Sequence, residues 1–221
     1  TGLTVSALGF GAMRFPLEGN PESIAERFNP ETKVDEAEAL RMIEYAAQQG
    51  INYFDTAYPY HGGQSEAIVG KGLKPHRKEV YIATKLPTMM VKKQEEFEPI
   101  LNEQLGRLDT DTIDLYLAHA LSRAGWHRMK EAGMLEFLDR IRADGRVRHV
   151  GFSFHDDVRA FKEIVDGYDW EFAQIQYNYF DEHNQAGREG LDYAASKGLG
   201  IVIMEPLRGG KLAGPVPKKI E

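Results

Sequence analysis

The chain has 221 residues, of which 42% are hydrophobic and 28% charged, with no cysteine and a formal net charge of −7. Its length suits one large domain, its acidic balance without a basic stripe argues against a nucleic-acid binder, and no apolar run approaches the roughly 18 residues of a membrane span. The lack of cysteine rules out disulfides and thiol catalysis within these residues, which leaves a soluble, cytoplasmic globular protein without nucleic-acid or membrane partners as our expectation.

Short apolar runs recur along the chain and are predicted to be strands. The first covers residues 5–13, and the six that follow begin at Ile51, Val80, Ile113, His149, Phe172 and Ile201. These six starts are separated by 23 to 36 residues, which is close to the length of one βα unit. The runs are continuously apolar rather than alternating, as expected for parallel strands that are covered on both faces.

Amphipathic segments between the runs are predicted to be helices. Asp35 and Glu38 form a capping-box pattern at the start of the first helix, and Gly50 has the expected place just beyond its end. Further apolar stripes at helical spacing cover residues 97–108, 134–141, 158–165 and 191–195. Trp126 and His127 fall between two predicted elements and are expected in a loop, where a tryptophan more often packs than binds.

The alternation of strands and helices favours a (β/α)8 barrel of which this chain represents seven of the eight units. A doubly wound open sheet is the alternative. The early run GFGA is too short for its dinucleotide fingerprint, because Phe15 stands where the third glycine should be. A missing strand would leave two apolar edges in water, so we expect the eighth strand outside these residues. Residues 1–214 are assigned to the barrel and residues 215–221 to a linker or tail.

Polar residues interrupt or follow the apolar runs at the ends where barrel enzymes place their chemistry. A single polar residue at such a position is a hydrogen-bonded core residue about as often as a functional one. Successive strand ends that carry Asp, Tyr, Lys, His and Ser nevertheless favour a functional site. The candidates are Asp55, Tyr60, Lys85, His119, Ser153, His155, Gln176, Asn178 and Glu205.

The chemistry of four of these residues suits protonation of a carbonyl oxygen. A Tyr60 hydroxyl with an ordinary pKa near ~10 is a poor acid at neutral pH, whereas a neighbouring Lys85 ammonium would lower that pKa and Asp55 would hold the ammonium in place. His119 could hydrogen-bond the carbonyl or relay a proton. No side chain donates hydride, so a nicotinamide or similar cofactor is implied.

The chain carries four motifs at these strand ends, namely DTAYPY at 55–60, SE at 65–66 with Gly70 beyond, ATK at 83–85 and DLYLAH at 114–119. At this spacing they resemble the signature of the aldo-keto reductase family, and the resemblance extends from Gly9 to about Leu212. It implies a (β/α)8 barrel that reduces a small-molecule carbonyl substrate. Tyr60 would then be the general acid, Lys85 and Asp55 its tuning pair, and His119 the residue that orients the carbonyl.

The same resemblance implies a set of cofactor-binding residues. Besides Asp55, they are Gly11, Met13, Ser153, Gln176, Met204, Leu207, Gly209 and Gly210. Two positions depart from the family pattern, because Phe154 follows Ser153 where Asn is usual and Met204-Glu205 precedes Pro206 where an aromatic residue is common. The family usually takes NADP(H), which we expect here with NAD(H) as the alternative, and no metal site is predicted since the seven histidines show no ligand spacing.

Several stretches, among them QIQYNYFDEHNQAG and MEPLRGGKLA, resemble a bacterial branch of the family that carries a Cys-rich, ferredoxin-like segment. That resemblance implies a 4Fe-4S cluster, and a redox partner protein, only if such a segment lies outside this chain. A non-catalytic or electron-transfer role is therefore one alternative to carbonyl reduction. A Schiff-base aldolase that uses Lys85 is another.

Overall fold

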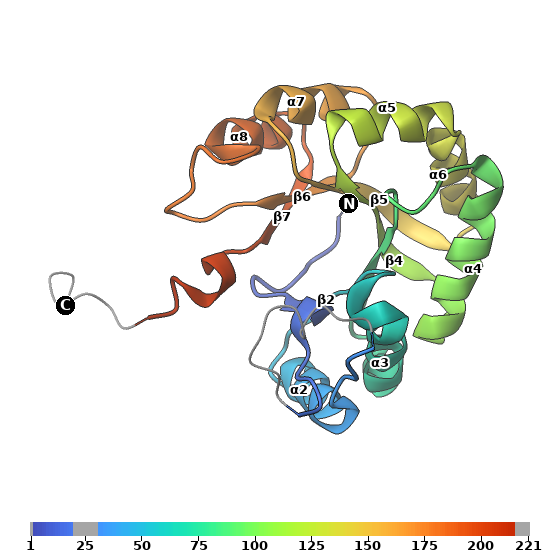
Figure 1. Ribbon diagram of the computed structural model, residues 1–221, viewed down its shortest axis with the longest axis vertical. Coiled ribbons are helices and arrows are strands. Elements are labelled where there is room, and N and C mark those ends of the chain that lie inside the picture. The colour runs from blue at the N-terminus through green and yellow to red at the C-terminus, as the bar shows by residue number, and fades with distance from the viewer. Residues whose placement is uncertain (1, 20–30, 215–221) are drawn as a thin grey trace, which may run out of the picture.

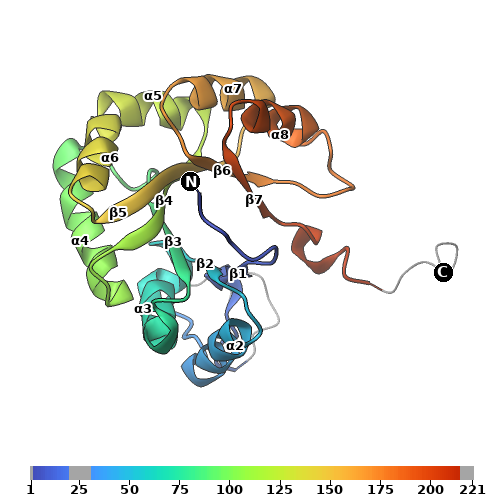
Figure 2. The ribbon, with the colours of Figure 1, turned by 180° about the vertical axis from the view of Figure 1, so that it is seen from behind.

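A computed structural model describes residues 2–19 and 31–214, and the predicted linker at 215–221 lies outside the described residues. Within them, a single parallel sheet has its strands in chain order. The strands are β1 (Phe10–Gly11), β2 (Tyr53–Asp55), β3 (Tyr81–Leu86), β4 (Ile113–Leu121), β5 (Val147–Phe154), β6 (Phe172–Gln176) and β7 (Gly200–Met204). The sheet curls about a central axis with the helices on its outside (Figure 1, Figure 2), which confirms the barrel-type fold.

The first strand is much shorter than predicted, because only Phe10 and Gly11 pair with β2. The residues before it bond to the loop that enters β2 instead. Ser6 donates its backbone N–H to Asn52 Oδ1 over 2.6 Å, and Leu3 packs against the residues that fill the inside of the barrel. The N-terminal segment therefore closes the amino-terminal end of the barrel interior, a task that its apolar composition does not distinguish from that of a strand.

The helices surround the sheet. They are α2 (Glu36–Gln48), α3 (Gln64–Leu73), α4 (Phe97–Leu108), α5 (Arg123–Glu131), α6 (Met134–Ala143), α7 (Val158–Asp166) and α8 (Gly187–Ser196). The N-cap and Gly50 are confirmed for α2, where Asp35 Oδ1 accepts the N–H of Glu38 over 3.1 Å and Gly50 has φ +85°. The reciprocal bond of a capping box is wrong, because the Asp35 N–H donates to the Pro16 carbonyl oxygen and the Glu38 carboxylate bonds Arg41. Among the described residues, we find no helix with the length and apolar content that crossing a membrane requires.

The loop predicted around Trp126 is wrong, because Trp126 and His127 lie in α5. This helix has few apolar residues, since only Trp126 and Met129 of its nine residues are buried, so its sequence shows little helical periodicity. Trp126 is 1% exposed and its ring centroid lies 6.0 Å from that of Trp170. Both tryptophans pack in the outer core between the sheet and the helices, which agrees with the packing role expected for Trp126.

Candidate active site

Lys85 lies inside the barrel near the carboxyl end of β3 and is 1% exposed. Its Nζ donates to Asp55 Oδ1 over 2.6 Å and to the carbonyl oxygen of Thr56 over 2.7 Å. Burial by itself would lower the pKa of Lys85, but the Asp55 carboxylate and Tyr60 outweigh it and raise that pKa above its ordinary value. The ammonium is therefore charged at neutral pH and held by an acidic partner on the neighbouring strand.

Tyr60 follows β2 on a short 3-10 turn, Tyr60–Gly63. Its ring centroid lies 5.0 Å from Lys85 Nζ. Burial raises the pKa of Tyr60 above its ordinary value, Lys85 opposes that shift, and Asp55 adds to it. Lys85 therefore acts on the pKa of Tyr60 in the predicted direction. The loss of solvent around the phenol outweighs the attraction of the ammonium for phenolate, so the pKa in the resting site is still above that of a free phenol.

His119 completes the group from β4, with its ring 5.8 Å from that of Tyr60 in an edge-on arrangement. Burial, aided by the charges of Lys85 and His155, lowers the pKa of His119 to about 3, so the imidazole is neutral at pH 7. Its Nδ1 is buried and has no hydrogen-bond partner among the described residues. The four residues predicted to form the catalytic group, Asp55, Tyr60, Lys85 and His119, therefore lie together.

Ser153 supports the part of β4 that carries His119. The pairing of β4 with β5 shifts register between Ala118 and Leu121, and Ala120 has φ +51°. Ser153 Oγ accepts the N–H of Ala120 over 2.7 Å and thereby satisfies a group that the bulge removes from the ladder. Its hydroxyl proton stays available to donate to a ligand.

The other predicted polar residues at these strand ends have mixed surroundings. Gln176 is 2% exposed and its Oε1 accepts from Asn184 over 3.1 Å. Asn178 Oδ1 accepts the N–H groups of Phe180 and Asp181, each over 3.0 Å, so this side chain builds the turn after β6. His155 is exposed and bonded to Gln185, and Glu205, also exposed, has φ +59° in the turn after β7.

Sequence reasoning missed Gln174, which is 5% exposed. Its Nε2 donates to Asp55 Oδ2 over 2.9 Å, which bridges the barrel interior from β6 to β2. Each carboxylate oxygen of Asp55 therefore has a donor, Lys85 on one side and Gln174 on the other. The alternation of side chains along β6 could have revealed Gln174, because it lies two residues before Gln176 and so faces the same side of the sheet.

The loop after β7 meets the loop after β1. A Cβ built on Gly209 would lie 3.6 Å from the Arg14 guanidinium, and Gly209 and Gly210 have φ values of +67° and +93°. Of the predicted cofactor residues nearby, Met204 ends β7, Leu207 is 51% exposed and Met13 is 44% exposed. Gly11 ends β1, and a Cβ on it would meet nothing within 4 Å. The predicted residues Gly11 and Met13 thus lie in the loop that approaches the glycines, together with Arg14, which the sequence did not single out.

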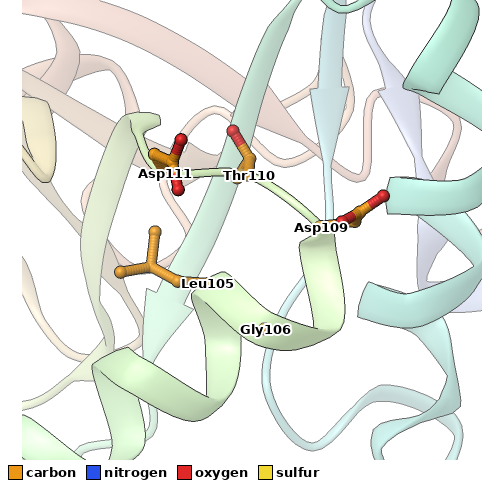
Figure 3. A pocket seen from close by; sticks show the side chains of 5 residues that line it. All are labelled: Leu105, Gly106, Asp109, Thr110 and Asp111. Carbon is orange, nitrogen blue, oxygen red and sulfur yellow. The ribbon is translucent and has the colours of Figure 1, made fainter.

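A separate pocket of about 340 Å³ lies at the other end of the sheet, between the end of α4 and the start of β4 (Figure 3). It is lined by Leu105, Gly106, Asp109, Thr110 and Asp111. No member of the catalytic group reaches it, and the Asp109 carboxylate is paired with Lys74 over 2.6 Å. The carboxyl ends of the strands, where the four residues lie together, are therefore the candidate active site. Within the described part of the chain, no three His, Asp or Glu side chains gather as metal ligands would.

The comparison with known proteins gives one family, since a model described as "Aldo/keto reductase family" matches residues 7–219. The uncharacterised oxidoreductase YrpG of Bacillus subtilis is 29% identical over 250 residues, covering 99% of this chain and 68% of its own length. L-galactose dehydrogenase of Arabidopsis thaliana is 28% identical over 226 residues, covering 98% and 66%. The holo form of aldo-keto reductase AKR11C1 from Bacillus halodurans superposes with a TM-score of 0.78 at 26% identity, covering 99% and 68%. Across the curated relatives, the chain spans 57 to 68% of their length.

Proposed function

Since this chain belongs to the aldo/keto reductase family of oxidoreductases, we propose that it reduces an aldehyde or ketone to an alcohol with hydride from a nicotinamide cofactor. The observation that carries the proposal is the buried Lys85 ammonium, bonded to Asp55 at 2.6 Å and 5.0 Å from the centre of the Tyr60 ring. A buried cation beside a phenol at the carboxyl ends of the strands suits transfer of a proton to a substrate oxygen.

In the proposed reaction, Tyr60 donates its hydroxyl proton to the carbonyl oxygen. A reduced nicotinamide, when bound, would supply the hydride for the carbonyl carbon, and the proton and hydride together convert the carbonyl to an alcohol. The phenol is protonated at neutral pH, and because burial raises its pKa and makes it a weaker acid, the transfer depends on Lys85. The phenolate that remains is stabilised by Lys85, and solvent returns the proton to it. Neutral His119 hydrogen-bonds the carbonyl oxygen and sets its position beside the Tyr60 hydroxyl.

The residues available at the site fit a nicotinamide dinucleotide. Ser153 can donate its hydroxyl proton to the carboxamide and Gln176 offers its amide. Met204 would lie against the nicotinamide ring. The open approach at Gly11, Met13, Leu207, Gly209 and Gly210 suits the rest of the cofactor. Arg14 beside Gly209 offers a positive charge to the pyrophosphate. NADP(H) is the cofactor we propose, with NAD(H) as the alternative.

The sequence also allows two other functions. A Schiff-base aldolase needs a neutral Lys85 amine, and the contacts with Asp55 and Thr56 favour the charged form instead. The iron–sulfur cluster with its redox partner concerns residues that this chain does not contain, so it stays a prediction. An electron-transfer role would combine tight cofactor binding with negligible aldehyde turnover.

The test is Tyr60→Phe in the full-length natural polypeptide. We expect NADPH and NADH affinities within about twofold of the parent protein, while turnover of 4-nitrobenzaldehyde falls by about 10²–10⁴-fold because the general acid is gone. Tyr45→Phe is the matched control, since Tyr45 lies on α2 and is 61% exposed. Undiminished turnover by the Tyr60 variant would refute the proposal. Parent protein that binds cofactor and reduces no aldehyde would favour the electron-transfer role.

A further inference from the structure

The layer between β3 and the helices α3 and α4 is polar. Glu66, Thr84, Gln104 and Tyr116 are each 0% exposed, yet all carry hydrogen-bonding groups. Burying such groups is unfavourable unless each has a partner, and apolar side chains alone would suffice to pack helices on a sheet. The polar layer lies directly behind the strand that carries Lys85, which raises the question of what it holds in place.

Gln104 on α4 holds the backbone of β3. Its Nε2 donates to the carbonyl oxygen of Lys85 over 3.0 Å and to Glu66 Oε1 over 2.7 Å. Its Oε1 accepts the Tyr116 hydroxyl over 2.7 Å. With its amide bonded at both ends, Gln104 fixes the main chain of the residue whose side chain is the buried ammonium.

Arg107, three residues further along α4, holds the loop that carries Tyr60. Its Nη1 donates to Glu66 Oε2 over 3.2 Å and to the carbonyl oxygen of Tyr58 over 3.3 Å, and its guanidinium lies 4.4 Å from the centre of the Tyr58 ring. The Tyr58 hydroxyl in turn donates to Glu103 over 2.8 Å.

The other end of the same loop also contacts Arg107. Gly63 has φ +93°, and a Cβ on it would lie 3.0 Å from Arg107 Nη2. Arg107 therefore contacts the loop on both sides of Tyr60, at Tyr58 and at Gly63. Because residues three apart on a helix share one face, Gln104 and Arg107 present the β3 contact and the loop contact from the same side of α4.

We propose that Gln104 and Arg107, joined through Glu66, are positioning residues that set the Tyr60 loop and the Lys85 strand relative to each other. The catalytic meaning of this inference rests on the proposed function. Tyr60 and Lys85 come from different elements and must stay adjacent for the ammonium to stabilise phenolate. A misplacement of about 1 Å is enough to cost a reaction a large factor in rate. Because Gln104 and Arg107 share one face of α4, strand β3 and the Tyr60 loop are both held by the same helix.

The test compares Arg107→Lys and Gln104→Met with the parent full-length protein. Lysine keeps the charge beside Glu66 but loses the planar guanidinium over the Tyr58 ring and its second nitrogen, which bonds Glu103 over 2.6 Å, and methionine keeps the volume of Gln104 without its hydrogen bonds. The matched controls are Arg41→Lys and Gln48→Met on α2, whose side chains are exposed and bond to the partly exposed Glu38 and Glu44. Native far-UV circular dichroism and tryptophan fluorescence establish that each variant is folded.

The first readout is the ionisation of Tyr60, followed by ¹⁹F NMR in protein labelled with 3-fluorotyrosine and assigned with Tyr60→Phe. Since Lys85 holds down the pKa of Tyr60, separation of the two groups should raise the titration midpoint in both variants by roughly one pH unit, the lower end of what an opposite charge at close range contributes. The second readout is turnover of 4-nitrobenzaldehyde, which we expect to fall by about tenfold to a hundredfold while the cofactor KM stays within about twofold.

Unchanged Tyr60 midpoints in both folded variants would overturn the inference, whatever happens to turnover. If Arg107→Lys does not fold, Glu66→Gln combined with Arg107→Gln removes both charges together and is judged by the same midpoint. Parent protein without aldehyde turnover would defeat the proposed function only, because the Tyr60 titration needs no substrate and still decides the positioning role.

Discussion

The contact between Lys85 and Asp55 makes a quantitative prediction for Asp55→Asn. Asparagine keeps the shape of the carboxylate but removes the charge that faces an ammonium 1% exposed. For two unit charges 2.6 Å apart, Coulomb's law at an effective dielectric constant near 20 gives about 6 kcal/mol. Removing one partner of a buried pair costs about 3–5 kcal/mol once the site relaxes. We expect the free energy of unfolding to fall by about that amount at pH 7.

The loss should also depend on pH, with a sign set by Lys85. In the parent protein the folded pKa of Lys85 is raised, so its stabilisation is complete below the unfolded pKa near ~10.4 and is lost as pH rises through the higher folded pKa. In the variant, burial acts without the carboxylate and lowers the folded pKa. Unfolding then takes up a proton, and the stability of the variant rises as pH approaches ~10. The difference between the two proteins is therefore largest near neutral pH.

The assay is urea unfolding at pH 7 and at about pH 9.5, followed by the fluorescence of the buried Trp126 and Trp170. The control is Asp166→Asn, whose carboxylate pairs with Lys197 over 2.8 Å in the open and should matter far less because water screens the pair. A loss for Asp55→Asn below about 1 kcal/mol, the range of an exposed pair, would refute this reasoning. So would a loss that is the same at both pH values.

Three further predictions follow from single contacts. Gln174→Leu removes the shorter hydrogen bond to Asp55 Oδ2, which also accepts the Tyr53 hydroxyl over 3.4 Å. It should lower the free energy of unfolding by about 1–3 kcal/mol in urea unfolding, with exposed Gln48→Leu as the control that should change little. Because the pKa of His119 is about 3, its ring signals in ¹H–¹⁵N NMR should stay those of neutral imidazole between pH 5 and 8, and a midpoint near 6.5 that disappears in His119→Gln would contradict the burial argument. Gly70→Ala places a Cβ 2.4 Å from the Leu108 carbonyl oxygen and should destabilise the protein by about 1–3 kcal/mol or more. Gly106 is exposed on α4, and a Cβ there meets nothing within 4 Å, so Gly106→Ala should stabilise the protein by up to about 1 kcal/mol. Equal thermal midpoints for the two variants would contradict the close contact at Gly70.

The sequence was most informative where the signal is local. Continuous apolar runs located the strands from β2 onward, and the motif residues Asp55, Tyr60, Lys85 and His119 lie together because parallel strands bring their carboxyl ends to one edge. The predicted bounds of β1 were wrong because an apolar segment that covers the end of a barrel and one that pairs as a strand have similar compositions. Helix α5 was missed because its exposed face leaves few apolar residues to reveal a period.

Contacts between distant parts of the chain could not be predicted in this way. Gln174 meets Asp55 across 119 residues of sequence, and Gln104 reaches Lys85 across 19. Neither glutamine stands out in its own segment, since each reads as one polar residue in an amphipathic or apolar run. The pKa of Tyr60 could not be predicted for a related reason, because its neighbours follow from the motif while the extent of its burial depends on the whole fold.

The packing of Leu3 makes the surroundings of Lys85 differ between the two ends of the barrel interior. Toward the amino ends of the strands, Leu3 packs against a buried cluster that includes Leu115 and Leu117, the second of which is the partner of Lys85 in the strand register. Apolar packing at that side strengthens the attraction between the Lys85 ammonium and the Asp55 carboxylate, because surroundings of low dielectric constant screen charges weakly. The N-terminal segment therefore contributes, through Leu3, to the surroundings of the Lys85–Asp55 pair although it lies far from both residues in the sequence.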